Sequence, residues 1–153
     1  MQVVELLDRF SADYKVSQHR PAFSAQRLAH EEHVHGMNVA KPVVVTADGR
    51  DYVCVLPACC RIDFDALRTV LGADHVELAD EDHVAELFAD CELGAEPPFG
   101  TLFEMPTLMD DTLGKDGFLV CQAGTHEKAV RLSLNDYQKL EKPKVMHFSY
   151  HLH

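Results

Sequence analysis

The sequence contains no tryptophan, few basic residues and no long apolar run. No segment approaches the roughly 20 apolar residues that a membrane-spanning helix needs. The N-terminus also lacks the basic and then apolar regions of a signal peptide. We therefore expect a cytoplasmic protein with no membrane partner. Its 153 residues, 46% hydrophobic and 25% charged, are typical of one soluble globular domain spanning residues 1–153.

Cysteine is present but sparse, with five scattered residues and no C-x-x-C pair. An odd number without metal-ligand spacing argues against both a disulfide framework and a structural zinc site. The serine-nucleophile motif G-x-S-x-G is absent as well. Cys121 and His126 could form a thiol nucleophile and its base. However, Cys121 ends the apolar run 118–120, where a buried and inert thiol is the better interpretation.

Basic residues are few, because 14 lysines and arginines face 25 acidic residues and give a net charge of −11. The imbalance is local. Residues 76–117 contain twelve acidic residues and a single base, Lys115, which together equal the whole net charge. The part of the chain from Phe118 onward is mildly basic, so one surface could still accept the phosphates of an RNA.

Helices and strands are predicted to alternate along the chain. Capping residues and apolar periodicity predict helices, and β-branched runs bounded by turn residues predict strands. The predicted helices are 2–13, 24–33, 63–71, 80–88 and 135–140, and the predicted strands are 14–18, a hairpin over 41–56, 76–78, 107–109, 118–121 and 129–133. Residues 89–105 are predicted to be a loop. The pattern favours a mixed sheet with helices packed around it, an α+β fold.

A histidine cluster, His30, His33 and His35, is the first candidate for chemistry. His30 and His33 share one face of the predicted helix and could chelate a metal. No matched third and fourth ligands stand out, although His75 or His83 could be recruited. Ten histidines in the chain make chance clusters common, so we favour an exposed helix end without a metal.

Lys41 raises a different question, because it stands immediately before Pro42 at the head of a buried strand. A lysine there can be a solvated residue that protects a sheet edge from pairing. It can equally be a cation aimed into a pocket. The residues themselves leave both interpretations open.

Two loops have the composition of a ligand site, ELGAEPPFG (92–100) and AGTHE (123–127). Both lie where a regular element gives way to a loop, and such loops commonly bind ligands. Gly94 and Gly100 would let the backbone approach a ligand closely, and Pro97 and Pro98 would stiffen the segment between them.

These segments, taken together in order, resemble the YbaK/EbsC family. The likeness is in HRPAFSAQ, VHGMNVAKPVVV, VLPA, GAEPPFG and AGTHEKAVRLSLNDY, closed by LEKP, from about Pro21 to about Val145. The family includes the editing insertion domain of bacterial prolyl-tRNA synthetase and its free-standing relatives, which are aminoacyl-tRNA deacylases. The resemblance implies a mixed, strongly curved, barrel-like sheet flanked by helices.

The activity that the resemblance implies is hydrolysis, in trans, of the ester between tRNA and a wrong, small amino acid. Alanine, cysteine or serine on tRNA(Pro) is the expected substrate, bound through the 3′-terminal adenosine. An aminoacyl-tRNA synthetase is a further expected partner, and no cofactor is expected. In this family the general base is thought to be the ribose 2′-hydroxyl of the substrate, which would explain why no protein nucleophile stands out.

The resemblance also implies site residues. Lys41 matches a lysine that handles the aminoacyl-adenosine end, Gly94 and Pro98 bound the G-x-x-x-P loop that positions the substrate carbonyl, and His126 belongs to a G-x-H turn that lines the pocket. These four are the predicted catalytic residues. The predicted substrate-binding residues are Pro97, Phe99, Gly100, Gly124 and Thr125.

Two positions depart from the family pattern. Pro42 stands where relatives often carry threonine or asparagine, and Gln122 stands where many have asparagine. Either difference could alter the amino acid that is accepted. A non-catalytic module that binds an aminoacyl-tRNA or a synthetase is the alternative function. A thiol hydrolase or a metal enzyme is a third possibility, which alkylation or chelators would reveal.

Overall fold

The computed structural model describes residues 2–151. The helices are α1 (Gln2–Arg9), α2 (Ala25–Glu31), α3 (Phe64–Leu71), α4 (Glu81–Leu87) and α5 (Leu134–Glu141), with short 3₁₀ turns η1 (Gly36–Asn38) and η2 (Gly100–Phe103). The strands are β1 (Tyr14–Gln18), β2 (Ala40–Ala47), β3 (Arg50–Pro57), β4 (Cys60–Ile62), β5 (Val76–Leu78), β6 (Thr107–Asp110), β7 (Phe118–Gln122), β8 (Lys128–Ser133), β9 (Lys144–Met146) and β10 (Ser149–His151). Across the described residues, no helix is long and apolar enough to span a membrane.

Local sequence signals place the starts of three helices where they were predicted. The side chains of Ser24, Asp63 and Asp80 each accept a hydrogen bond from a backbone N–H of the first turn of α2, α3 and α4. Gly72 ends α3 in the left-handed conformation. The first helix is shorter than predicted, because α1 ends at Arg9 rather than at residue 13.

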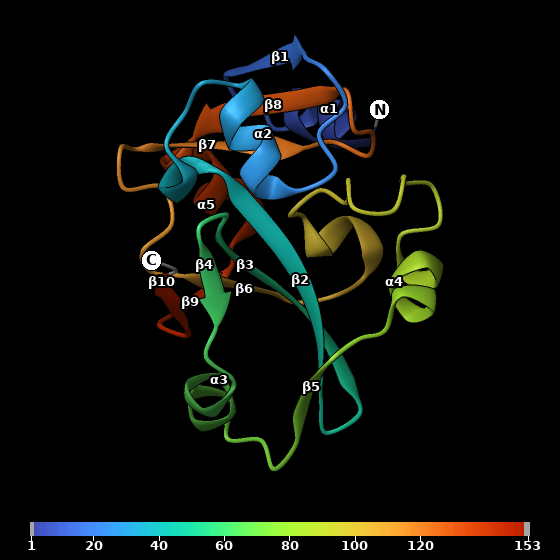
Figure 1. Cartoon of the computed structure of the whole chain (residues 1–153), viewed down its shortest axis with the longest axis vertical. Helices are drawn as coiled ribbons and strands as arrows, with labels where there is room; N and C mark the ends of the chain where they lie inside the picture. The colour runs from blue at the N-terminus through green and yellow to red at the C-terminus, as the bar shows by residue number, and fades with distance from the viewer. Residues whose placement is uncertain (1, 152–153) are drawn as a thin grey trace.

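The strands form three sheets (Figure 1). Five strands lie in the order β5-β2-β3-β6-β9, three in the order β1-β8-β7, and β4 pairs with β10. Most neighbours are antiparallel, but β3–β6 and β6–β9 are parallel, so the largest sheet is mixed as predicted. The three-residue strands β4, β9 and β10 were not predicted, whereas β5, of the same length, was predicted as 76–78.

The predicted barrel-like sheet is not supported. Closure would require the two edge strands of the large sheet to pair with each other. Those edges, β5 and β9, are three-residue strands at opposite ends of the strand order. Within the described chain, one isolated bridge joins the three-stranded sheet to Val39, the residue immediately before β2, through Val120. The sheets therefore pack against each other as separate open sheets.

Alternation of side chains along the strands builds two cores. Val53 and Val55 of β3 face the three-stranded sheet, in a cluster that also contains Leu119 of β7. Cys54 and Leu56 point to the opposite face and join a cluster with residues of β4 and α3. Because successive side chains on a strand point to opposite faces, β2 and β3 separate these two cores. The same alternation decides which side of β2 each pocket residue occupies.

Candidate functional site

The two predicted loops, 92–100 and 123–127, pack directly against each other. The backbone N–H of Glu92 donates to the carbonyl of Gly124, and the N–H of Gly124 donates to the carbonyl of Ala95, both at 2.9 Å. The carboxylate of Glu92 also accepts the backbone N–H of His126 at 3.0 Å. These three bonds fix the G-x-x-x-P loop on the G-x-H turn.

Gly94 is the point of closest approach between the two loops. Its φ is +90°, a conformation that costs a residue with a side chain about 1–3 kcal/mol. A Cβ at this position would lie 3.2 Å from Cε1 of His126 and 3.5 Å from the carbonyl oxygen of Phe23. Only glycine satisfies both demands without strain. The N–H of Gly94 donates to the carboxylate of Glu96 at 3.1 Å, so this amide already holds an anionic oxygen.

His126 is held in one tautomer by its surroundings. Its Nδ1 lies 3.0 Å from the carbonyl oxygen of Ala22, and the side chain is only 8% exposed. Because a carbonyl oxygen can only accept, Nδ1 carries a proton and donates it to Ala22, which leaves Nε2 as the ring nitrogen that faces away from this bond. The ring of Phe23 covers this imidazole, with centroids 4.5 Å apart and an angle of 43° between the planes.

Phe23 was not singled out from the sequence, although it lies in the HRPAFSAQ segment. It is 72% exposed, whereas most large apolar side chains here are buried. It directly precedes the N-cap Ser24, so the start of α2 holds it in place. The sequence shows only an aromatic residue next to a helix N-cap. Its relevance to the site depends on its position over His126, which only the structure shows.

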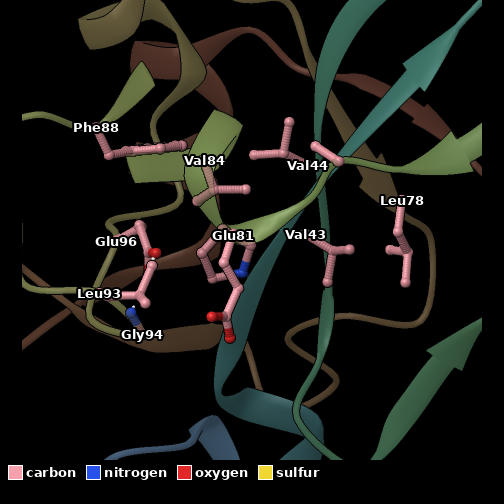
Figure 2. Close-up of a pocket in the computed structure, with 11 residues that line it drawn as sticks. Val43, Val44, Leu78, Glu81, Val84, Phe88, Leu93, Gly94 and Glu96 are labelled. Carbon is pink, nitrogen blue, oxygen red and sulfur yellow. Dashed lines mark hydrogen bonds between the residues drawn. The ribbon is translucent and has the colours of Figure 1, made fainter. Parts of the chain in front are cut away.

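A cavity of about 280 Å³ lies between β2, α4 and the G-x-x-x-P loop (Figure 2). Its walls are mainly apolar, and two carboxylates lie among them. The lining residues are Pro42, Val43, Val44, Leu78, Ala79, Glu81, Val84, Phe88, Leu93, Gly94 and Glu96. This volume lies just below the roughly 300–1,000 Å³ of pockets for drug-sized ligands, which suits a small group such as an aminoacyl group.

Lys41 occupies the opposite face of β2 from Pro42 and Val44. Its ammonium donates to the carbonyl oxygen of Cys60 at 2.5 Å, and burial lowers its pKa. It lines a second cavity, of about 380 Å³, between β2, β4 and β10. The two cavities share Val43 and Leu78 as lining residues. The structure therefore places Lys41 in the hollow next to the one that Gly94 lines.

The remaining predicted residues divide into two groups. Pro97, Gly124 and Thr125 line a third hollow behind the loop, of about 350 Å³. Phe99 and Gly100 lie in the core, where the Phe99 ring meets Tyr137 edge-on at 5.3 Å.

Pro98 is held from behind by the same tyrosine. The Tyr137 hydroxyl donates to the Pro98 carbonyl at 2.5 Å, and the Tyr137 side chain is completely buried. The end of the G-x-x-x-P loop is thereby tied to α5. Among the predicted residues, the structure brings Gly94 and His126 into direct proximity.

The cysteine candidate has the properties of an inert thiol. Cys121 is 1% exposed and belongs to the core between the sheets. Its burial raises the pKa of the thiol to about 12, so the thiolate needed for nucleophilic attack is disfavoured.

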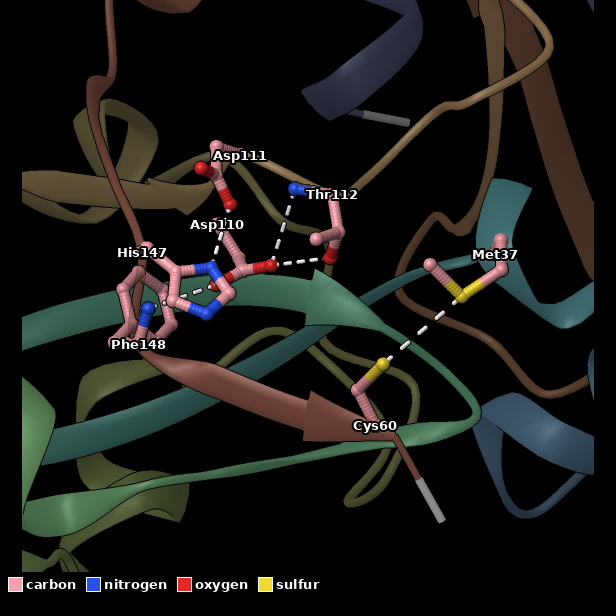
Figure 3. A network of polar contacts seen from close by, with 7 residues as sticks. All are labelled: Met37, Cys60, Asp110, Asp111, Thr112, His147 and Phe148. Atoms are coloured by element: carbon pink, nitrogen blue, oxygen red, sulfur yellow. Dashed lines mark hydrogen bonds and ion pairs between the residues drawn. The ribbon is translucent and has the colours of Figure 1, made fainter. Parts of the chain in front are cut away.

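One group of metal-ligand type in the described chain is Asp110, Asp111 and His147, whose ligand atoms lie within 4.8 Å of one another (Figure 3). A cation could be held there. However, the carboxylate of Asp110 already accepts the N–H groups of Phe148 and Thr112, at 2.9 and 3.2 Å. The group therefore ties β6 to the C-terminal segment. The predicted histidine cluster, His30, His33 and His35, does not lie on one helix. His33 lies beyond the end of α2 and has a positive φ, and Nδ1 of His35 accepts the N–H of Met37 at the start of η1.

Comparison with solved structures finds proteins of the same fold. A crystal structure of a hypothetical protein has a TM-score of 0.88 at 18% identity, covering 98% of this chain and 100% of the other. A structure described as "a putative trans-editing enzyme for prolyl tRNA synthetase" has a TM-score of 0.84 at 18% identity, covering 97% and 95%. At such identities these matches establish a shared fold.

The family follows from the sequence match. Residues 19–140 match the aminoacyl-tRNA editing domain. The chain belongs to this family of YbaK-type editing domains, as the resemblance predicted. Among curated proteins, none matches the sequence.

Proposed function

We propose that this protein is a trans-editing deacylase that hydrolyses the ester of alanine, cysteine or serine on tRNA(Pro). The observation that carries the proposal is Gly94, which has a positive φ, lies against His126 and lines an apolar cavity. Family membership supports the reaction class, and the cavity supports a small acyl group.

The aminoacyl group would enter the 280 Å³ cavity with its side chain against Val44 and Val84. The α-ammonium needs an anionic partner, and Glu81 and Glu96 supply carboxylates in the same cavity. Figure 2 shows Glu81 near the middle of the lining residues and Glu96 at one side of them, near Leu93 and Gly94. The apolar wall offers little discrimination, because one methylene changes binding by only about 1–3 kcal/mol.

The terminal adenosine would remain outside the cavity, where Phe23 lies exposed over His126. Stacking of a nucleobase on an aromatic side chain contributes about 1–3 kcal/mol. The ribose would then lie near His126, whose Nε2 can accept a hydrogen bond from a ribose hydroxyl. The 2′-hydroxyl could in turn orient the attacking water.

Water attack on the ester carbon moves negative charge onto the carbonyl oxygen. The Gly94 N–H, now bonded to the Glu96 carboxylate, would donate to that oxygen instead. Collapse of the tetrahedral intermediate breaks the bond between the carbonyl carbon and the ribose oxygen. The ribose oxygen takes up a proton, and the products are the free amino acid and uncharged tRNA.

Lys41 would have to leave the Cys60 carbonyl to reach this substrate. Its flexible four-carbon stem and its place beside the shared wall residue Val43 make that movement feasible. The ammonium would then contact the acyl ester or the terminal phosphate. This movement is the part of the proposal most open to test.

The test is deacylation of tRNA(Pro) charged separately with alanine, cysteine, serine and proline. We compare the wild type with Lys41→Ala, and with Lys15→Ala on the exposed strand β1 as the matched control. Loss of one non-cognate ester, with Pro-tRNA spared and only Lys41→Ala inactive, is the expected result. Binding of charged tRNA without any hydrolysis would instead support the non-catalytic module.

A further inference from the structure

Three sulfur atoms meet where η1 contacts the turn between β3 and β4. Sδ of Met37 lies 3.2 Å from Sγ of Cys59 and 4.0 Å from Sγ of Cys60. Figure 3 shows the Met37 and Cys60 sulfurs pointing toward each other. Each residue comes from a fixed backbone element, since the N–H of Ala58 donates to the carbonyls of Gly36 and Val39 at 3.1 and 3.0 Å.

We propose that Met37, Cys59 and Cys60 form a binding site for a soft monovalent metal ion, Cu(I). Thiolate and thioether ligands select Cu(I) over harder divalent ions. A metal–sulfur bond of about 2.3 Å places the sulfurs of a trigonal site about 4 Å apart, and the Met37–Cys60 pair already has this spacing. The Met37–Cys59 pair reaches it when the half-buried Cys59 side chain rotates outward.

The surroundings suit an ion that arrives from solvent. Cys60 is buried at 2% exposure, whereas Met37 and Cys59 are partly exposed, so one side of the site is open. All five cysteines, Cys59 and Cys60 included, are free thiols. Gly36 allows the close approach, because a Cβ there would lie 3.3 Å from Sγ of Cys59.

Burial raises the pKa of the Cys60 thiol to about 11, so a bound thiolate needs a positive charge beside it. Binding of Cu(I) by both cysteines releases two protons to solvent and leaves a complex with a net charge of −1. The Lys41 ammonium donates to the backbone carbonyl of Cys60 and interacts electrostatically with both cysteines. It therefore supplies the compensating positive charge at the site. Structural zinc sites have four ligands, which are thiolates, imidazoles or carboxylates rather than thioethers, so three sulfur ligands that include a thioether do not suit zinc.

The test is anaerobic titration of the full chain with Cu(I) supplied as its coloured bicinchoninate complex. We expect the wild type to withdraw one equivalent of Cu(I) and bleach the dye. Cys91→Ser, which removes a partly exposed cysteine outside the cluster, is the matched control and should behave like the wild type. Cys59→Ser should withdraw no metal.

Met37→Leu distinguishes this site from a simple pair of thiols. The substitution preserves an apolar side chain of similar volume but removes the thioether. Loss even of an outer-shell partner weakens metal affinity about 10–100-fold, so we expect loss of this ligand to cost about 100-fold. Circular dichroism checks that each variant is folded. Retention of one equivalent at wild-type affinity by Cys59→Ser or Met37→Leu would overturn the proposal, as would no uptake by the wild type.

One consequence rests on the proposed function. The loaded site would hold Lys41 at the Cys60 turn, so one equivalent of Cu(I) should slow deacylation by the wild type but not by Cys59→Ser. The two proposals fail separately. No deacylation by the metal-free protein counts against editing, whereas no uptake from the dye complex counts against the metal site.

Discussion

Replacement of Gly94 by alanine tests whether the contact between the two loops is functional. Gly94 has a φ of +90°, and a Cβ would meet Cε1 of His126 at 3.2 Å. At that distance the imidazole must move by a few tenths of an ångström. The movement is costly, because Ala22 and Phe23 hold the His126 ring in place. The substitution therefore combines backbone strain with displacement of the ring.

The two effects have different magnitudes and different readouts. The strained φ should lower the free energy of unfolding by about 1–3 kcal/mol. For a chain of this size, each kcal/mol lowers Tm by about 2–4 °C. A misplacement of 1 Å near the chemistry can cost about 100-fold, so a smaller shift of His126 should reduce deacylation by about 10- to 100-fold.

Gly49→Ala is the matched control. Gly49 has a φ of +82° in the β2–β3 turn, and a Cβ there would meet nothing within 4 Å. Both variants should show a similar fall in Tm by differential scanning calorimetry. Only Gly94→Ala should lose hydrolysis of Ala-tRNA(Pro), measured as release of labelled alanine. Equal activity of the two variants at a temperature where both are folded would refute the reasoning.

Three further predictions concern the surroundings of the site. Phe23→Ala should raise KM for charged tRNA about 5- to 150-fold, because stacking of about 1–3 kcal/mol is lost. The control Phe10→Ala also removes an exposed ring and should leave KM unchanged. Equal KM values for the two variants would exclude the stacking role. Tyr137→Phe removes the hydroxyl that donates to the buried Pro98 carbonyl, and should lower the unfolding free energy, measured in urea, by about 1–3 kcal/mol. An unchanged urea midpoint would contradict this prediction. The hydrogen bond that His83 donates to the Asp51 carboxylate, at 2.8 Å, raises the pKa of His83 above 6.5. The stability that this pair contributes is fully present below pH 6.5 and is lost as the pH rises through the raised pKa of His83. His83→Gln should therefore flatten the change in Tm over that pH range. Parallel Tm profiles of the two proteins would show that this pair is not responsible.

The hydrogen bond between His83 and Asp51 attaches one wall of the cavity to β3. Asp51 lies on β3 and His83 on α4, which forms one wall of the cavity through Glu81 and Val84. In the folded state, protonation of His83 strengthens its bond to Asp51 and thus the attachment of this wall. Deacylation measured over the same pH range in both proteins would show whether that attachment affects the reaction.

The sequence alone determined the local features. Ser24, Asp63 and Asp80 predicted helix starts because a capping side chain bonds to an N–H only two or three residues away. The turn residues Ala47, Asp48 and Gly49 predicted the hairpin turn, and Asp48 and Gly49 take the positive φ that a two-residue hairpin turn requires. The order of the family segments predicted the editing-domain family, which the match over residues 19–140 confirms.

Only the tertiary structure decided which residues meet across long stretches of chain. Gly94 and His126 were both predicted, but their contact and the position of Phe23 over His126 depend on how α2 and the two loops pack. Lys41 lies in the hollow beside Cys60 because β2 turns alternate side chains to opposite faces, which a predicted strand without a known partner could not reveal. The large sheet is open because its edge strands β5 and β9 lie at opposite ends of the strand order, an arrangement that the sequence of neither strand specifies.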